Sequence, residues 1–215
     1  MDFIGAYSPD HIIFLLKGFW VTLKIAGISI VFSFILGAVL GIARYAKIPV
    51  LAQISIFFVE LIRNLPLLLI IFFVYFALPE IGIKLGITWS AIVALTIFES
   101  AMLAEVIRSG LNSVHKGQME AGRSSGLTYT QTLWHVILPQ GMRRMVPPIV
   151  SQFISLLKDT SLAVVIALPE LMHNAQVINA QNINYIIPVF LLVAVIYFVV
   201  NYLLSLVARR LELNM

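Results

Sequence analysis

The sequence lacks several residue types and patterns that enzymes and metal proteins rely on. It has no cysteine among its 215 residues, which excludes disulfide bonds, thiolate metal sites and cysteine nucleophiles. Its four histidines are scattered and none is four residues from another, so no helical pair of metal ligands is expected. It also contains no Gly-x-x-x-x-Gly-Lys-Ser/Thr run, the loop that cradles nucleotide phosphates. We therefore expect no catalytic site, no metal site and no ATP site in this chain.

Charged residues are scarce as well. They make up 11% of the sequence, against 60% hydrophobic residues, and the mean hydropathy is +1.00. A soluble domain carries roughly 25% charged residues, so this chain has too few to cover a water-exposed surface. The net charge of +4 need not indicate nucleic acid, because lysines and arginines at membrane edges give the same balance. The composition predicts a membrane protein surrounded mostly by lipid, and the apolar segments described next make it an all-α one.

Apolar segments long enough to cross a bilayer predict five membrane-spanning helices. We interpret the start of the first segment as a short interfacial helix that turns into the span near Thr22. Arg63 to Pro66 interrupt the second segment, and Lys158 to Ser161 interrupt the fourth. The five segments are 12–43, 51–78, 87–111, 146–168 and 186–207.

Basic residues gather at alternate ends of these segments. Nine of the fourteen lysines and arginines fall on one face of the predicted bundle, and a surplus of positive charge marks the cytoplasmic side. We therefore expect the N-terminus outside and the C-terminus inside the cell. The nine residues are Arg44, Lys47, Arg108, Lys116, Arg123, Arg143, Arg144, Arg209 and Arg210.

The polar stretch between the third and fourth segments carries an ordered set of helix signals. Residues 120–125 can form a short helix, and Gly126 suits the left-handed residue that ends it. Thr128 and Gln131 then match a capping box that starts a second helix, which we expect to end around Pro139. The pattern predicts two short helices with a sharp turn. From these signals alone, an ordinary helical loop without a partner is an equal alternative.

The same stretch resembles the EAA loop of ABC-importer permeases. Glu120, Ala121 and Gly126, followed by residues 136–139, carry this resemblance. Residues 104–121 and the run Lys158-Asp159-Thr160-Ser161-Leu162 are similar to permeases for polar amino acids, the histidine/glutamate/glutamine/arginine permease family. The resemblance covers about residues 22–211. At Gly122 the motif usually has alanine, and a glycine could loosen the first helix by up to about 1 kcal/mol.

This resemblance implies a domain organisation. Residues 1–17 would be an extracytoplasmic segment, and residues 18–211 a type I ABC-importer transmembrane domain. Its cytoplasmic coupling loop, at about residues 113–140, would dock on a separate ATPase. The residues expected to couple are Glu120, Ala121, Gly122, Gly126, Leu127, Leu138 and Pro139.

Polar residues inside the predicted spans are candidates for a substrate pathway. A charge near the bilayer centre costs on the order of 2.5–3.5 kcal/mol on insertion scales, and Lys158 and Asp159 complement the carboxylate and ammonium of an amino acid. The alternative is that these charges form buried pairs that fix the helix bundle. The candidate pathway residues are Lys158, Asp159, Thr160, Ser161, Glu99, Ser100, Gln152, Arg63 and Asn64.

Two closer pairs have structural interpretations. Glu105 and Arg108, three residues apart, are expected to pair on one helix face. Gly37 and Gly41 permit close helix packing, which we expect within the chain rather than across a dimer.

The resemblance implies a multi-pass permease subunit in a bacterial cytoplasmic membrane, importing polar amino acids with glutamine or glutamate favoured. ATP and Mg would be used by an ABC ATPase dimer, and an extracytoplasmic amino-acid-binding protein would deliver the substrate. A second permease subunit, identical or merely similar, would complete the pathway, and no nucleic acid is implied. The alternatives are a secondary transporter or channel subunit, or an ABC permease for another small polar solute.

Overall fold

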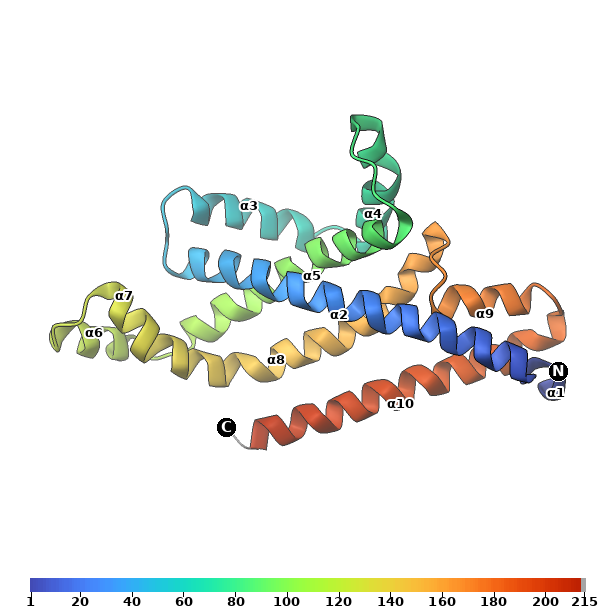
Figure 1. The fold of residues 1–215 in the computed structure, drawn as a ribbon. Coiled ribbons are helices and arrows are strands. Elements are labelled where there is room, and N and C mark those ends of the chain that lie inside the picture. The colour runs from blue at the N-terminus through green and yellow to red at the C-terminus, as the bar shows by residue number, and fades with distance from the viewer. Residues whose placement is uncertain (214–215) are drawn as a thin grey trace. The chain divides into compact units, whose positions relative to one another are not determined.

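The computed structural model describes residues 1–213, and it consists of helices joined by short turns, with no strand among those residues (Figure 1). The α-helices are α1 (Phe3–Ala6), α2 (Pro9–Tyr45), α3 (Leu51–Arg63), α4 (Leu67–Phe72), α5 (Ile87–Asn112), α6 (Lys116–Ser124), α7 (Tyr129–Thr132), α8 (Leu138–Asp159), α9 (Leu171–Asn179) and α10 (Ile186–Leu213). Two π-helices, η1 (Phe73–Ala77) and η3 (Leu133–Ile137), and three 3₁₀ helices, η2 (Leu78–Ile81), η4 (Thr160–Ile166) and η5 (Ile183–Tyr185), extend or join them.

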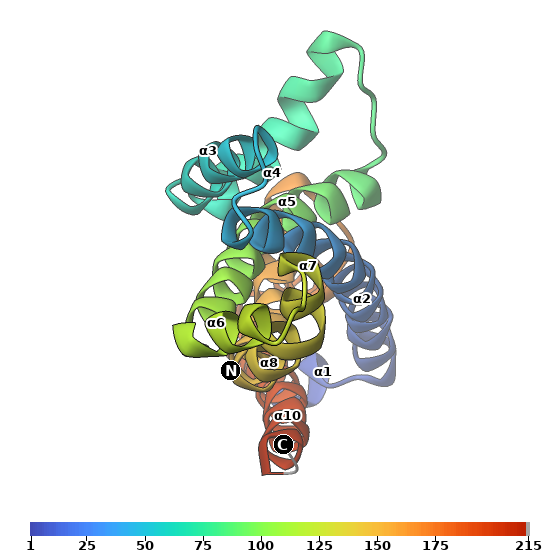
Figure 2. The same cartoon turned by 90° about the vertical axis from the view of Figure 1, so that its left-hand side faces the viewer.

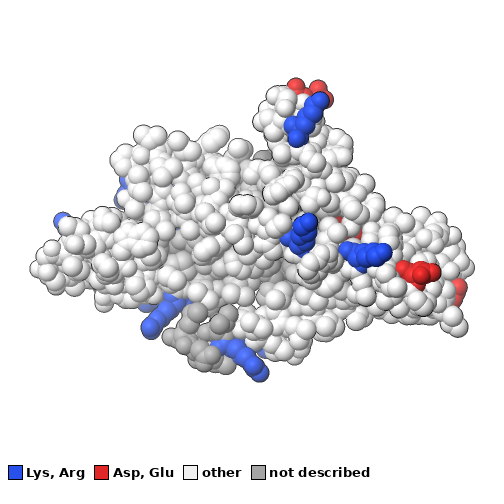
Figure 3. All heavy atoms as spheres, viewed as in Figure 1, with Lys and Arg blue, Asp and Glu red and all other residues white. Residues whose placement is uncertain are grey.

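Four helical stretches within residues 1–213 are long and apolar enough to cross a membrane, and a broken pair supplies a fifth. The predicted all-α architecture is therefore confirmed, and the predicted five spans are reached when the broken pair is counted as the second span. In the view of Figure 3 most of the surface belongs to uncharged residues. The four continuous stretches are Pro9–Tyr45, Ile87–Asn112, Tyr129–Ile166 and Ile183–Arg210, and the broken pair is Leu51–Arg63 with Leu67–Ile81.

The first span is one continuous helix, so the expected turn near Thr22 is wrong. Helix α2 starts with Pro9 in its first position, and Ser8 accepts the N–H of His11 at 3.4 Å. No proline follows before Pro49. The hydroxyl of Thr22 does not break its own helix. It accepts the N–H of Leu171, the first residue of α9, at 3.2 Å.

The second span breaks where the sequence predicts. Helix α3 ends at Arg63, and Pro66 adopts the extended conformation that precedes α4. The amide of Asn64 donates to the carbonyl of Glu60 at 2.7 Å, which satisfies one of the last free carbonyls of α3. The break therefore uses the local hydrogen bonds of a normal helix end.

The fourth span begins earlier than predicted. Pro139 does not end the second helix of the polar stretch, because the chain continues from α7 through η3 into α8. Pro139 is the second residue of α8 and directly follows the π-turns of η3. Such wide turns shift the hydrogen-bond register, which lets a helix accept a residue without an N–H. The expected break after Asp159 is confirmed, since the helix tightens there into the 3₁₀ turns of η4.

Two compact units make up the chain, and each has a core of its own. The first combines Met1–Val31, Pro66–Thr96 and Ile154–Leu206. Its core joins α1, the start of α2, α9 and α10. That core consists of Ala6, Leu15, Leu171, Ala175, Ile178, Val189 and Val193.

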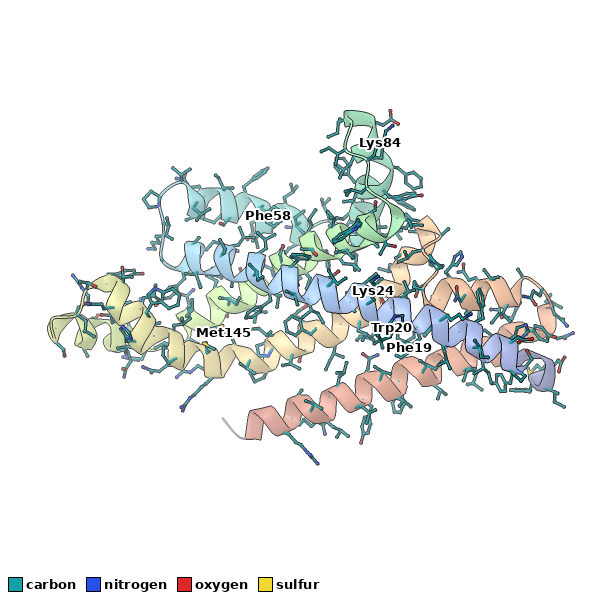
Figure 4. All side chains as sticks on the ribbon, in the orientation of Figure 1. Phe19, Trp20, Lys24, Phe58, Lys84 and Met145 are labelled. Carbon is teal, nitrogen blue, oxygen red and sulfur yellow. The ribbon has the colours of Figure 1, made fainter. Side chains whose placement is uncertain are left out.

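The second unit combines Phe32–Leu65, Ile97–Phe153 and the end of α10 from Val207. Here α2 packs directly on α5: a Cβ on Gly37 would lie 2.8 Å from the Cβ of Leu103, and one on Gly41 would lie 2.7 Å from the carbonyl oxygen of Ala104. The prediction that these glycines serve packing within the chain is confirmed. The core consists of Leu103, Ile107, Leu111, Val114, Leu133, Ile137, Met145 and Ile149, of which Met145 is labelled on α8 in Figure 4.

Candidate functional site

The turn between α6 and α7 is held by two backbone hydrogen bonds. The N–H of Leu127 donates to the carbonyl of Gly122 at 3.2 Å, and the N–H of Gly126 donates to that of Arg123 at 3.1 Å. Gly126 has a φ of +87°, the left-handed conformation that favours glycine. This arrangement is a Schellman motif, and it confirms the predicted end of the first helix.

The next helix starts with the predicted capping box. The side chain of Thr128 accepts the N–H of Gln131 at 3.2 Å, and the side chain of Gln131 accepts the N–H of Thr128 at 2.8 Å. Only Leu127 separates this box from Gly126, so both sides of the turn are fixed. Figure 2, which faces this end of the unit, shows α6 and α7 as a short pair ahead of α8. The polar stretch is therefore a rigid knob, a name we use below for residues 116–132.

Gly122 has a different role from the one the sequence suggested. It is buried, and a Cβ there would lie 2.5 Å from Cγ2 of Thr132 on α7. Thr132 cannot easily move, because its hydroxyl donates to the carbonyl of Thr128 at 3.0 Å. The glycine lets α6 and α7 touch, a packing role that its helix propensity alone does not indicate.

The other predicted coupling residues divide into a surface set and an anchoring set. Glu120, Ala121, Gly126 and Pro139 are exposed. Leu127 and Leu138 are half-buried, and Leu138 packs against the core of the second unit. The knob therefore offers a polar outer surface on an apolar base, the form expected of a docking element.

Four predicted pathway residues lie together in the first unit, where α8 passes into η4. Lys158 is exposed, Asp159 and Ser161 are half-buried, and Thr160 is fully buried. The hydroxyls of Thr160 and Ser161 donate to the carbonyls of Leu157 and Lys158, both at 2.7 Å. The oxygen of Ser161 remains able to accept a hydrogen bond from a ligand, whereas that of Thr160 is closed off from solvent. This change of helix type brings polar groups together within one turn.

The remaining pathway residues belong to the second unit. Glu99 and Ser100 are buried in α5, and Gln152 is half-buried in α8. Arg63 and Asn64 are exposed at the end of α3. The guanidinium of Arg63 lies 3.8 Å from the carboxylate of Glu105, so its contact is with a charge cluster that the sequence did not predict.

That cluster joins three helices of the second unit. Arg44 of α2 lies 2.9 Å from Glu105 of α5 and 3.5 Å from Glu60 of α3. Arg108 also contacts Glu105, as its spacing predicted. Only that last pair is close in sequence; the other contacts depend on tertiary packing, so no spacing could reveal them.

Glu170, at the start of α9, is a second feature that the sequence reasoning missed. Its side chain is fully buried and accepts the N–H groups of His173 at 2.7 Å and Met172 at 2.9 Å. The hydroxyl of Thr22 lies 3.4 Å from the same carboxylate. Burial raises the pKa of Glu170 to about 7 against the opposing effect of these hydrogen bonds. Glutamate is not a preferred N-cap residue, so no local signal marks this role in the sequence.

Comparison with known proteins places this geometry in a family. The family model described as binding-protein-dependent transport system inner membrane component matches residues 30–215. The probable glutamine ABC transporter permease protein GlnP of Bacillus subtilis is 69% identical over 100% of this chain and 99% of its own length. The glutamine transport system permease protein GlnP of Escherichia coli K12 is 36% identical, over 94% of this chain and 92% of its own.

Solved structures agree with this assignment. An amino acid ABC transporter crystallised with histidines contains a chain that matches with a TM-score of 0.92 and 27% identity, covering 100% of this chain and 99% of that one. The MetNI methionine ABC transporter in an inward-facing conformation matches with a TM-score of 0.74 over 95% of this chain and 99% of its own, at 21% identity, a likeness of fold. The chain therefore belongs to the binding-protein-dependent transport system inner membrane components, the multi-pass permease subunits of ABC importers in the cytoplasmic membrane.

Proposed function

We propose that this permease carries polar amino acids, with glutamine as its main substrate. The observation that carries the proposal is the 69% identity over the whole chain to a probable glutamine permease. More distant relatives are named for L-cystine, at 38% identity, and for arginine, at 33% identity, both from Bacillus subtilis. All these relatives are named for amino acids, which supports the substrate class. The higher sequence identity to the glutamine permease favours glutamine within that class.

In this proposal the knob couples the permease to a separate ABC ATPase dimer, which uses ATP and Mg. A rigid element can transmit a push, whereas a flexible loop would absorb it. The two fixed sides of the turn at Gly126 and the close contact of Gly122 with Thr132 support this role. Glu120 and Ala121 supply the exposed surface that the ATPase would grip. The permease itself would contribute no catalytic residue and no cofactor site.

The substrate would pass through a path lined by the polar groups at the change from α8 to η4. Broken helices at mid-membrane depth hold charged substrate groups in several transporters. Lys158 would attract the carboxylate of the amino acid and Asp159 its ammonium, while Ser161 would accept a hydrogen bond and the buried Thr160 would lie behind it. Glu99, Ser100, Gln152, Arg63 and Asn64 are the further candidates of this path.

An extracytoplasmic amino-acid-binding protein would deliver the substrate to the face that carries the N-terminus, with residues 1–17 outside and the C-terminus inside. Residues 18–211 would form the translocating domain. A second permease subunit, either another copy or a similar chain, would face this one across the path.

Uptake into proteoliposomes tests the substrate. The chain would be reconstituted with its ATPase and binding protein, and uptake of radiolabelled glutamine would be measured against a panel of unlabelled amino acids. We expect glutamine to compete at the lowest concentration and glutamate next. Stronger competition by cystine, arginine or a solute that is no amino acid would contradict the assignment.

A further inference from the structure

A cavity of about 480 Å³ lies in the second unit between the knob and the turn that follows α2. Its volume falls within the range of about 300–1,000 Å³ typical of small-ligand sites. Apolar side chains such as Met119 and Ile137 form part of the wall. The polar groups that line it include Tyr45, Lys47, His115, Lys116, Glu120 and Tyr129.

The charges around this cavity favour an anion. Lys47 and Lys116 line it together with a single carboxylate, that of Glu120. Within residues 1–210, whose side chains the structure describes, neither lysine forms an ion pair with an acidic side chain. Two unpaired ammonium groups facing one space attract an anion more strongly than either does alone.

His115 adds a hydrogen-bond donor, and the tautomer of its ring is fixed by a backbone contact. It caps α6, and its Nδ1 accepts the N–H of Gly117 at 3.1 Å. In the neutral ring the proton must therefore sit on Nε2, which leaves that nitrogen as a donor. The backbone at Lys47 is also fixed, with a φ of +52° in a turn closed by the N–H of Ile48 on the carbonyl of Ala43 at 3.1 Å. The cavity thus has a donor of known tautomer as well as charge.

The position of the cavity along the spans indicates where its ligand comes from. Tyr45 is the last residue of the first candidate span and Asn112 the last residue of the third, and both line the cavity. Span ends lie at the level of the lipid headgroups, where tyrosine is enriched. Basic pockets between spans on the cytoplasmic side can bind anionic headgroups.

We propose that this cavity binds a phosphate group, and that the group is the headgroup phosphate of an anionic phospholipid. Lys47 and Lys116 pair with the phosphate oxygens, and His115 donates to one of them. The bound headgroup fills the space between the knob and the end of α2 and so supports the base of the knob. The proposal does not depend on which amino acid is carried.

Lipid retention by the purified full-length chain tests the proposal. The chain would be purified in neutral detergent, offered equal amounts of phosphatidylglycerol and phosphatidylcholine, and examined by native mass spectrometry. We expect preferential retention of one phosphatidylglycerol per chain. The double variant Lys47→Gln with Lys116→Gln should lower its affinity roughly 25-fold, since each lysine near anionic lipid contributes about fivefold. The variant Lys47→Arg with Lys116→Arg keeps both charges and should retain the lipid.

A matched control removes two other lysines. Lys24 on α2 and Lys84 after η2, both labelled in Figure 4, do not line the cavity. Replacing both with glutamine lowers the net charge by the same amount and should leave retention within about twofold of the wild type. Circular dichroism and gel filtration establish that each variant is folded.

Four results would overturn the assignment. Unchanged phosphatidylglycerol retention in the folded Lys47/Lys116 glutamine variant would exclude the cavity. Equal loss in the Lys24/Lys84 variant would show a general effect of charge. If the cavity variant loses only its binding to the ATPase, the space is a protein-docking pocket. Displacement of the lipid by inorganic phosphate of equal affinity would overturn the lipid source in favour of free phosphate.

Discussion

The buried carboxylate of Glu170 caps α9, and we expect it to set how the stability of the first unit depends on pH. Glu170 is fully buried, and its pKa is raised from the ordinary value of 4.5 to about 7. Between these values the folded chain binds more protons at this site than the unfolded chain does. Protonated Glu170 therefore contributes its full stabilisation of the folded chain below pH 4.5, and this contribution is lost as the pH rises through about 7. Over that window the loss amounts to at most about 3 kcal/mol.

The variant Glu170→Gln tests this prediction, because the amide stays neutral and its oxygen can still accept one N–H of α9. We expect the wild-type unfolding temperature to fall between pH 5 and pH 8, and the variant to lose most of that slope. Differential scanning fluorimetry in detergent measures both. Glu80→Gln, which replaces an exposed carboxylate of the same unit, should keep the wild-type slope; a steep slope in Glu170→Gln would assign the titration to another group.

Single residues also show where reasoning from the sequence fails. Gly122 looked like a weak point of a helix, yet in the fold it is the contact point of two helices. The propensity cost is a local quantity, whereas the position of Thr132 opposite it is set by the turn between them. Glu105 is similar: Arg108 is visible three residues away, but Arg44 and Arg63 reach it only through packing.

At the scale of elements, local hydrogen-bond patterns were the most predictable feature. The Schellman turn at Gly126, the capping box of Thr128 and the breaks at Pro66 and Asp159 all follow from side chains within a few residues of one another. The continuous course of α2 past Thr22 was not expected, although no proline interrupts it, and the hydroxyl of Thr22 forms its hydrogen bonds with Glu170 and Leu171. Local signals predict where helices can end, and tertiary partners decide whether they do.

The turn at Gly126 gives a test of coupling. A left-handed conformation costs most L-residues roughly 1–2 kcal/mol, while asparagine tolerates it. A Cβ at Gly126 meets nothing within 4 Å, so a substitution strains only the backbone. We expect Gly126→Val to distort the knob and to reduce amino-acid uptake per ATP hydrolysed several-fold in proteoliposomes. Gly126→Asn should couple nearly as well as the wild type.

In that experiment the amount of inserted permease and the basal ATPase rate serve as references, because the strain lies outside the spans. A ratio of uptake to hydrolysis that is the same in Gly126→Val and in the wild type would contradict the role of the knob in coupling.

At the scale of the whole molecule, composition and hydropathy predicted the class of protein and the number of spans. A chain with so few charged residues needs a lipid environment, and the lengths of its apolar segments determine how many helices cross the bilayer. The pathway is harder to predict, because its candidates come from segments distant in the sequence. Lys158 to Ser161 belong to one compact unit, whereas Glu99, Ser100 and Arg63 belong to the other.

Asp159 decides between a pathway and a structural pair. If its carboxylate receives the substrate ammonium, Asp159→Asn removes a charge-assisted hydrogen bond that typically contributes about 1.5–3 kcal/mol. The KM for uptake should then rise roughly tenfold or more, with the amount of inserted permease unchanged. Asp10→Asn, at the start of α2, serves as the matched control. A pair that fixes the bundle predicts the opposite pattern, in which abundance and unfolding temperature fall while the KM of the remaining permease stays the same.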